Sequence, residues 1–366
     1  MQESGHRILV AMSGGVDSSV AAALLKDQGH EVIGAFMRNG VKAGTVRGRG
    51  QGCCGVEDAL DARRVAERLD IPFYSIDLEE AFEGLIGEFV DAYARGDTPN
   101  PCIECNRRFK MGALRHLARR LGSPAVATGH YARIVERSGR LAVERGHDGE
   151  KDQSYVLFSL DQDALRATRF PLGDLTKAQV RAVARERNLP VAEKAESMEI
   201  CFVPTGDYRD VLRERRPEVF AKGPIVDQSG RVLGEHGGTA LFTVGQRRGL
   251  PGGQGRPIFV TEVRPETNTV VVGREEDVRT TRFLVTDGVF TGAPEGPPGT
   301  EVTGAIKIRS HHEAVPATIT FEGDGAFRVT SGVPLFAVTP GQSAVLYDGD
   351  RVLLGGRISR EPSHCV

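Results

Sequence analysis

The first 130 residues alternate between strand-like and helix-like patterns, and this alternation restricts the possible folds more than any other feature of the chain. Strand patterns occupy residues 7–12, 31–37, 72–78 and 124–128, and helical patterns occupy 18–28, 56–69, 79–95 and 107–121. Such alternation is typical of a doubly wound α/β fold, a parallel sheet with helices on both faces. Ligands of these sheets bind at the carboxyl ends of the strands. We therefore expect functional residues in the loops after Met12, Met37, Leu78 and Thr128.

From about residue 205 the sequence changes character, because Gly and Pro become dense and apolar runs become short and alternating. Runs at 269–273, 304–308, 317–321 and 344–347 are typical of small antiparallel sheets or a barrel. Upstream, a hairpin is predicted at 133–145 and a helix at 176–188, with Thr176 as N-cap and Pro190 as stop. The predicted domains are an α/β nucleotide-binding domain at 1–204, a small central module at 205–279 and a C-terminal antiparallel β-barrel at 280–366.

The distribution of charge is more informative than its sum. The 47 Lys and Arg nearly balance the 49 Asp and Glu, and a formal charge of −2 alone disfavours a nucleic-acid partner. However, residues 57–91 hold eleven acids, whereas 106–120 hold six basic residues and no acid, and 236–261 are acid-free with Arg247, Arg248 and Arg256. These basic segments are candidate phosphate contacts.

Neither the apolar runs nor the cysteines indicate a membrane or secreted protein. No apolar run approaches the roughly 18 residues that span a bilayer. Six cysteines in 366 residues are too few for a disulfide scaffold. We expect a cytoplasmic protein with reduced thiols and no membrane partner.

The segment SGGVDSS (residues 13–19) follows the first predicted strand and opens the first helix. Two glycines let the backbone approach an anion, and a helix N-terminus with Ser hydroxyls favours a pyrophosphate. Asp17 could hold Mg²⁺, which is bound by oxygen ligands shared with phosphates. A Walker A loop is excluded because the chain contains no Gly-Lys dipeptide.

Cys102 and Cys105 form a C-x-x-C pair where the basic helix begins. A helix N-terminus and the neighbouring Arg107 and Arg108 would favour the thiolate of Cys105, which makes this thiol a candidate nucleophile. Cys201 lies about a hundred residues further along.

Other interpretations of the cysteines remain open. One C-x-x-C falls short of the four ligands of a structural zinc site. An iron–sulfur cluster held by Cys102, Cys105 and Cys201, with one iron open to sulfur, is an alternative. Cys53 and Cys54 lie in a Gly-rich loop near the expected active face and could equally be buried structural thiols; Cys365 is not expected to take part.

Seven segments together resemble the bacterial tRNA 2-thiouridylase family (MnmA type), within the PP-loop ATP pyrophosphatases. They occur in the family's order and span nearly the whole chain. The segments are SGGVDSS, TPNPCIECN (98–106), TGHYAR (128–133), KDQSYVL (151–157), EICF (199–202), GQRRGL (245–250) and TPGQSAVLY (339–347).

The resemblance implies an ATP-dependent tRNA-uridine 2-sulfurtransferase acting on the wobble uridine, position 34, of tRNAs for Lys, Glu and Gln. The C2 oxygen would be adenylated and then replaced by sulfur. Cys201 would carry the sulfur as a persulfide received from a sulfur-carrier protein or cysteine desulfurase. Cys105 would release it and leave a Cys105–Cys201 disulfide that is reduced in each cycle.

The resemblance also implies binding residues at three places. ATP with Mg²⁺ would be bound by Ala11, Met12, Ser13, Gly14, Gly15, Val16, Asp17, Ser18, Met37 and Gly129. The flipped target base would lie against Asn100, Pro101 and Cys102. Further tRNA contacts would come from the central module and from His130, Lys151, Asp152, Gln153, Arg309, Ser310 and Gln342.

Two positions depart from the family pattern. Cys102 stands where many members carry Asp, which puts a carboxylate base at this position in doubt and favours the cluster alternative. Ala195-Glu196-Ser197 replaces an Asp-Ser pair before the second thiol. The competing hypotheses are another PP-loop adenylating ligase, which needs neither RNA nor a thiol pair, and a non-catalytic iron–sulfur RNA-binding module.

Overall fold

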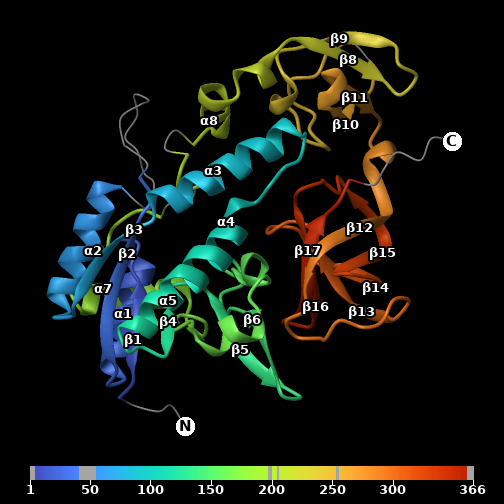
Figure 1. Cartoon of the computed structure of the whole chain (residues 1–366). Helices are drawn as coiled ribbons and strands as arrows, with labels where there is room; N and C mark the ends of the chain where they lie inside the picture. Colours follow the sequence, from blue (N-terminus) through green and yellow to red (C-terminus); the bar gives the residue numbers. More distant parts are fainter. Residues whose placement is uncertain (1–4, 41–54, 197–199, 204–205, 253–254, 361–366) are drawn as a thin grey trace.

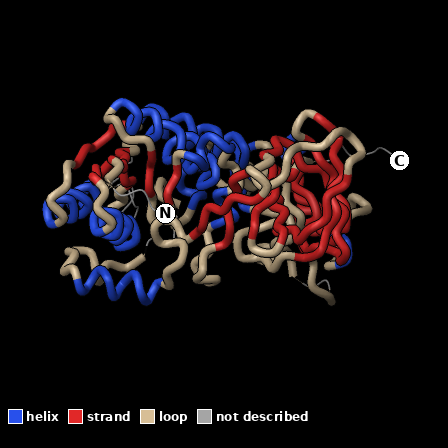
Figure 2. Tube along the Cα trace, turned by 90° about the horizontal axis from the view of Figure 1, so that it is seen from below, coloured by secondary structure: helices blue, strands red, loops and turns tan. Residues whose placement is uncertain are grey.

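The computed structural model describes residues 5–40, 55–196, 200–203, 206–252 and 255–360. It comprises a helix-covered parallel sheet, a small central sheet and a barrel (Figure 1). Strands concentrate at the barrel end of the molecule and helices at the opposite end (Figure 2). The predictions about Cys53, Cys54 and Cys365 lie outside the described residues.

The first sheet has the expected doubly wound architecture. Its five parallel strands run in the order β3 (Phe73–Asp77), β2 (Glu31–Arg38), β1 (Arg7–Ala11), β4 (Ala125–Ala127) and β7 (Thr168–Arg169). The strand order reverses between β1 and β4, where ligands of such sheets bind. Sequence analysis predicted the first four strands but not β7, whose two residues carry no periodicity.

Helices cover both faces because successive strand residues point to opposite sides. Ile8 and Val10 of β1 pack with α1 (Val16–Asp27), α2 (Val56–Arg68) and α7 (Lys177–Glu186). Leu9 packs on the other face with Leu114. Further α-helices are α3 (Glu79–Ala94), α6 (Gln162–Arg166) and α8 (Tyr208–Arg215). Short 3-10 helices occupy Ser154–Leu157, Pro217–Phe220, Thr239–Leu241, Pro265–Thr267 and Glu276–Val278.

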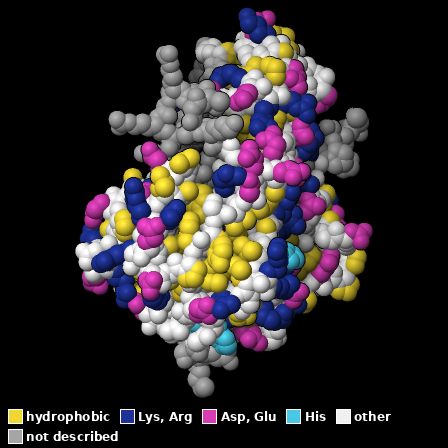
Figure 3. Space-filling view, turned by 60° about the vertical axis from the view of Figure 1, so that its left-hand side comes forward, with side chains coloured by type: hydrophobic (Ala, Val, Ile, Leu, Met, Phe, Trp, Pro, Cys, Tyr) yellow, Lys and Arg dark blue, Asp and Glu magenta, His cyan; other side chains and the backbone are white. Residues whose placement is uncertain are grey.

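One edge of this sheet presents apolar surface. β3 is the edge strand, and Tyr74 on it, together with Val56 and Leu60 of α2, is exposed. Hydrophobic side chains gather on the same face (Figure 3). None of the described helices is long and apolar enough to cross a membrane.

The predicted basic helix begins earlier and has a different geometry than expected. α4 (Pro101–Glu104) leads into a π-helix, η1 (Cys105–Ala113), followed by α5 (Leu114–Arg120). The run starts at Pro101 because the Asn100 side chain accepts a hydrogen bond of 3.1 Å from the Cys102 amide, and Pro suits the first helical position. Cys105 therefore lies inside the helical run rather than at its N-terminus.

The central module has a four-stranded mixed sheet. Its strand order is β10 (Phe259–Arg264), β11 (Thr269–Gly273), β8 (Gly223–Asp227) and β9 (Val232–His236), with β11 and β8 parallel.

The C-terminal strands form a closed antiparallel barrel. They are β12 (Arg279–Val289), β13 (Glu301–Lys307), β14 (Val315–Gly323), β15 (Ala326–Phe336), β16 (Ser343–Asp348) and β17 (Arg351–Ile358). Pairing of β12 with β17 closes the barrel around a core that includes Phe283, Ile319 and Phe327.

The hairpin predicted at 133–145 is present as β5 (Ala132–Arg137) and β6 (Arg140–Arg145), but it joins the barrel sheet. β6 pairs with β17 through Glu144 and Arg351. Val143 packs in one cluster with Val345 and Tyr347 of β16. The hairpin therefore links the nucleotide-binding unit and the barrel through a shared core.

Candidate nucleotide and thiol site

A cavity of about 340 Å³ opens at the carboxyl ends of β1, β2 and β4, as the sheet topology predicts. It brings together most of the residues that sequence analysis singled out. These are Ala11, Met12, Ser13, Gly15, Val16, Asp17, Ser18, Met37, Pro101, Cys102, Cys105, Gly129, His130, Lys151, Gln153 and Cys201.

The nucleotide loop is held in shape by its own hydroxyls and by close packing. The Ser18 hydroxyl accepts a 3.1 Å hydrogen bond from the Ser13 amide, and Ser19 donates to the Gly15 carbonyl at 2.8 Å. Gly14 has a φ of 74°, and a Cβ there would lie 2.2 Å from the carbonyl oxygen of Asp58. Only glycine fits this position.

Gly129 brings the loop after β4 against the start of α1. A Cβ at Gly129 would lie 2.6 Å from the Ser18 amide nitrogen, so a larger residue would separate the two loops. This close approach places the two predicted halves of the nucleotide site at one end of the sheet.

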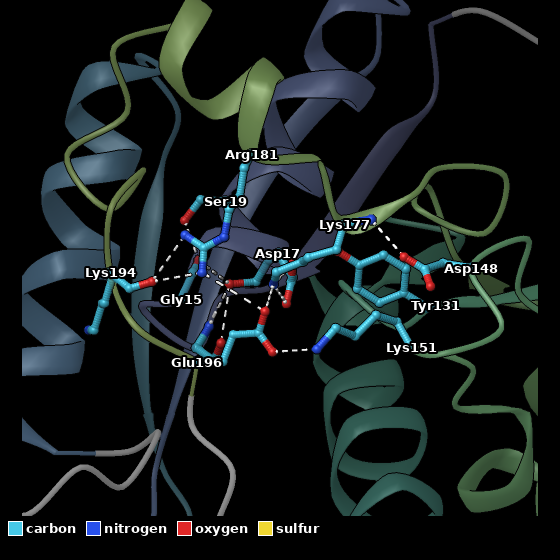
Figure 4. Close-up of polar contacts among 12 residues, drawn as sticks. Gly15, Asp17, Ser19, Tyr131, Asp148, Lys151, Lys177, Arg181, Lys194 and Glu196 are labelled. Carbon is cyan, nitrogen blue, oxygen red and sulfur yellow. Dashed lines mark hydrogen bonds and ion pairs between the residues drawn. The ribbon is translucent and has the colours of Figure 1, made fainter. Parts of the chain in front are cut away.

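Asp17 lies at the centre of a charge network at the mouth of the loop (Figure 4). The Lys177 ammonium donates to both Asp17 oxygens at 2.7 and 2.9 Å, and the Tyr131 hydroxyl donates to Oδ1 at 2.8 Å. Burial and the charge of Asp17 raise the pKa of Tyr131 above its ordinary value, so this phenol stays protonated. Sequence analysis did not predict a role for Lys177. The only feature of the nearby sequence that points to this position is the predicted helix start at Thr176.

Glu196 binds three cations on the opposite side of this network. Lys151 and Lys177 lie 2.8 and 3.1 Å from its carboxylate, and Arg181 lies at 3.9 Å. Burial would raise the pKa of Glu196, but hydrogen bonds from the two lysines outweigh it and the pKa lies below its ordinary value. Glu196 is thus an ionised anchor close in sequence to Cys201.

Lys194 connects the same segment to the nucleotide loop. Its ammonium lies 2.7 Å from both Asp58 and Asp61 and donates to the Gly14 carbonyl at 3.0 Å. Burial opposes the charge, yet the two carboxylates raise the pKa of Lys194. Lys194 therefore remains charged beside the predicted phosphate site.

His130 lies at the end of β4 with its ring buried. Its Nδ1 is 2.7 Å from the Thr128 hydroxyl and its Nε2 is 3.2 Å from the Lys110 ammonium. Burial, followed by the charge of Lys110, lowers the pKa of His130 well below its ordinary value. The imidazole is therefore neutral, with Nε2 accepting from Lys110 and Nδ1–H donating to Thr128.

The thiols lie at the apolar end of the cavity. Cys105 is buried in a cluster with Phe82, Leu85 and Phe109, and Cys201 packs against this cluster. Cys102 is exposed.

The two arginines expected to act on Cys105 bind acids instead. Arg107 lies 2.6 Å from Glu104, and Arg108 lies 2.7 Å from Glu88. Their charges are largely compensated by these carboxylates. Asn100 caps the helical run at the Cys102 amide, so the helix N-terminus lies one turn before Cys105.

The two implied inorganic groups fit these residues differently. Asp17 lines the cavity and, together with substrate phosphates, would supply the kind of oxygen ligands that Mg²⁺ binds. Within the described ranges, no three Cys, His, Asp or Glu side chains are arranged to hold a metal ion. The arrangement of the described cysteines therefore does not match the iron–sulfur alternative.

The remaining predicted tRNA contacts make internal hydrogen bonds. Asp152 accepts from the Gly146 and Ser154 amides, and Arg309 donates to the Ala337 carbonyl and the Thr339 hydroxyl, both at 2.9 Å. Gln342 donates to the Thr98 carbonyl at 2.6 Å. Ser310 follows β13, and Asn100 caps α4.

Three family models match successive parts of the chain, from residue 6 to residue 358. Residues 6–205 match a family model described as tRNA methyl transferase HUP domain, 209–274 match tRNA methyl transferase PRC-barrel domain, and 280–358 match aminomethyltransferase beta-barrel domain.

Curated relatives match along nearly their full length, and each is named tRNA-specific 2-thiouridylase MnmA. The Chloroflexus aggregans protein is 48% identical over 361 residues, covering 96% of this chain and 98% of the relative. The Carboxydothermus hydrogenoformans protein is 46% identical over 358 residues (97% and 98%). The Mycolicibacterium smegmatis protein is 48% identical over 366 residues (97% and 99%).

Proposed function

Because the chain belongs to the tRNA-specific 2-thiouridylase family, we propose that it is an ATP-dependent tRNA-uridine 2-sulfurtransferase. The observation that carries this proposal is that the predicted pyrophosphate loop and three cysteines, among them Cys105 and Cys201, line one cavity. The descriptions of the matching family models refer to methyl transfer. Methyl transfer, however, requires neither an ATP-binding loop nor a thiol pair. Sulfur transfer to an adenylated oxygen uses both.

The first half of the reaction activates the base. Residues 13–18 bind the ATP phosphates, with Lys177 and Lys194 supplying positive charge from the other side. Mg²⁺ held by Asp17 would add further charge neutralisation on the phosphates. The uridine C2 oxygen attacks the α-phosphorus, pyrophosphate leaves, and N3 gives up its proton to solvent or a base. The apolar walls formed by Met37, Phe82 and Leu85 suit a base taken out of its stack.

The second half transfers sulfur. The Cys105 thiolate attacks Sγ of a Cys201 persulfide, a Cys105–Cys201 disulfide forms, and the electron pair of the broken S–S bond leaves on hydrosulfide. Hydrosulfide adds at C2, the C2–O bond breaks, AMP leaves, and N3 regains a proton. A dithiol reductant then restores the two thiols.

Partners and location follow from this chemistry. The substrates would be tRNAs for Lys, Glu and Gln at position 34, and a sulfur-carrier protein or cysteine desulfurase would load Cys201. We place the reaction in the cytoplasm, where tRNA and reduced thiols occur together. The basic residues of the 106–120 run and Arg247, Arg248 and Arg256 would contact phosphates.

Nucleoside mass spectrometry of tRNA from cells lacking this protein tests the proposal. We expect 2-thiouridine at position 34 to disappear and to return with the wild-type gene. Cys105→Ala and Cys201→Ala should fail to restore it while the purified variants still bind ATP. Cys365→Ala is the matched control and should restore it fully. Unchanged 2-thiouridine in the deleted strain would overturn the proposal.

Iron and sulfide analysis after anaerobic purification separates the two sulfur mechanisms. An iron-free, colourless protein that thiolates tRNA with a persulfide donor supports the relay through Cys201. Stoichiometric iron that is required for activity and is lost in Cys102→Ser would contradict the relay and favour a cluster.

A further inference from the structure

Lys177 forms ion pairs with two carboxylates that come from different parts of the chain. Its ammonium lies 2.7 Å from Asp17 of the nucleotide loop and 3.1 Å from Glu196, near the end of the α/β domain. Both carboxylates point toward this ammonium (Figure 4). All three side chains line the cavity, so another anion that enters the cavity meets a lysine that is already bound to two acids.

Three cations surround Glu196, although one carboxylate carries only one negative charge. Besides Lys177, Lys151 lies 2.8 Å from it, and Arg181, one turn further along α7, lies at 3.9 Å. Burial raises the pKa of Glu196, but hydrogen bonds from Lys151 and Lys177 lower it below its ordinary value, so the carboxylate is ionised. Cations that converge in this way on a partly exposed carboxylate also suit the oxygens of a phosphate.

The phosphates of ATP require some of the same cations. In the proposed reaction Lys177 supplies positive charge to the phosphates from the side opposite the nucleotide loop. Phosphate oxygens and an ionised carboxylate repel each other at short distance, and the repulsion is strong where water is partly excluded. A phosphate that bonds to Lys177 therefore competes with Glu196 for this lysine.

ATP affects the two carboxylates on Lys177 differently. Mg²⁺, which binds carboxylate and phosphate oxygens together, would compensate the charge of Asp17. Glu196 lies on the other side of the network, and its partners are the cations Lys151, Lys177 and Arg181. Of the two carboxylates, Glu196 is therefore the one that the phosphates displace.

We propose that Glu196 competes with the phosphates of ATP for Lys151 and Lys177, so that nucleotide binding displaces its carboxylate. Glu196 is then a specificity-determining residue, because an anion binds only where its bonds to the loop and the lysines are stronger than those of the carboxylate. A polyphosphate meets this condition better than a single phosphate, since it carries more charge and more acceptor oxygens. The inference rests on the proposed function only in taking ATP as the ligand.

Calorimetric titration of the full-length protein with ATP and Mg²⁺ tests the competition through the sign of the change. Glu196→Gln removes the charge and keeps the shape of the side chain, and we expect it to lower the Kd for ATP about three- to tenfold. Inorganic pyrophosphate, which has neither base nor ribose, should gain a similar factor. Adenosine, which has no phosphate, should bind as it does to the wild type.

Glu193→Gln is the matched control, because it removes an acid from the same segment, one that pairs with exposed Arg185. It should leave all three affinities unchanged. Circular dichroism confirms that each variant is folded, and Glu196→Ala is a second neutral variant if Glu196→Gln does not fold.

ATP binding that is unchanged or weaker in a folded neutral variant would overturn the inference, because Glu196 would then at most orient the lysines. An equal gain for adenosine would also overturn it, since the effect would not arise at the phosphates. A wild-type protein that binds no ATP would overturn the proposed function as well, whereas an unchanged Kd in the variant overturns this inference alone.

Discussion

At the scale of single residues, Lys177 is the side chain on which the charge balance of the nucleotide loop depends most. It is 12% exposed and bridges Asp17 and Glu196, two carboxylates from opposite ends of the α/β domain. The charge at the nucleotide loop is therefore balanced by a lysine about 160 residues further along the chain.

Lys177→Met should weaken ATP binding about ten- to a hundredfold, since hydrogen bonds to charged groups contribute about 1.5–3 kcal/mol. Calorimetric titration with ATP and Mg²⁺ measures the change. Arg185→Met, on the same helix but paired with exposed Glu193, should bind ATP as the wild type does. Equal affinities in both variants would exclude a role for Lys177 at the phosphates.

His130 should make stability depend on pH. A histidine in the unfolded chain titrates near about pH 6.5, whereas burial and Lys110 lower the pKa of His130 in the folded protein. Below about pH 6.5 the unfolded state binds a proton that the folded state does not. The contribution is therefore complete above that pH and falls by about 1.4 kcal/mol per pH unit below it, down to the folded pKa.

Urea denaturation between pH 5 and 8 tests this sign. Replacement of His130 by Asn should remove this part of the slope, and His116→Asn on the exposed side of α5 should retain it. A slope that is the same with and without His130 would show that the imidazole is not held neutral.

Site residues that form one short motif could be predicted from the sequence, whereas single residues far from these motifs could not. The loop from Ser13 to Ser18 and the Cys102–Cys105 pair could be predicted because each forms one contiguous motif with a recognisable chemistry. Lys110, Lys177 and Lys194 could not be predicted. In the sequence, a single lysine that lines the cavity cannot be distinguished from a lysine on a solvent-exposed helix face. Only the fold brings them to the cavity.

At the scale of elements, α7 was predicted most completely. Thr176 accepts from the Gln179 amide, and the Gln179 side chain accepts from the Thr176 amide, which is the reciprocal capping box that fixes the helix start. Lys177 is the next residue, so the cap also orients the phosphate-side lysine.

Thr176→Ala should lower the free energy of unfolding by about 1 kcal/mol, with about 0.5–2 as the range for lost caps. Thr176→Ser keeps the hydroxyl and should lose only a few tenths. Chemical denaturation compares them, and ATP affinity should fall in the alanine variant alone. Identical stabilities of the two variants would mean that the cap contributes nothing.

The run from 101 to 120 shows why an element's geometry is harder to predict than its existence. Its apolar and basic pattern predicts a helix, but this pattern does not distinguish α- from π-hydrogen bonding. In the structure, Phe109 of the π-helix stacks on Phe82 of α3, a contact between segments that the local pattern does not contain. The sequence correctly identified Arg107 and Arg108 as basic residues close to Cys105. It did not show that their side chains pair with acids, because Glu88, the partner of Arg108, comes from another helix.

At the scale of the whole molecule, the barrel holds the loop that leads to the thiols. The Pro340 carbonyl accepts from the Thr98 amide at 2.8 Å, and Gln342 donates to the Thr98 carbonyl. Arg360 lies 3.6 Å from Asp97 and donates to the Arg95 carbonyl. The sequence could predict a barrel from its alternating runs, but not that one of its turns supports the active-site loop.

Gly341→Ala should disturb this contact. Gly341 has a φ of 87°, and a Cβ there would lie 2.8 Å from the Thr98 amide nitrogen. Gly349 has a φ of 58° but nothing within 4 Å of an added Cβ, so Gly349→Ala controls for backbone strain alone. We expect Gly341→Ala to cost at least about 1 kcal/mol more than the control in thermal unfolding, and to slow thiolation.

Equal effects of the two glycine substitutions would show that the turn and the Thr98 loop are not energetically coupled. A slower thiolation with unchanged ATP affinity would show that the barrel acts on the thiol end of the cavity.

The pairing of β6 with β17 has a consequence for the order of biosynthesis. Glu144 leaves the ribosome about 200 residues before Arg351, its partner across the two strands. At about 5–20 residues per second, the hairpin waits for about 10–40 seconds before its sheet can be completed. During that interval Val143 lacks the β16 side chains that later cover it, so nascent chains of this protein should present a transient binding site for chaperones.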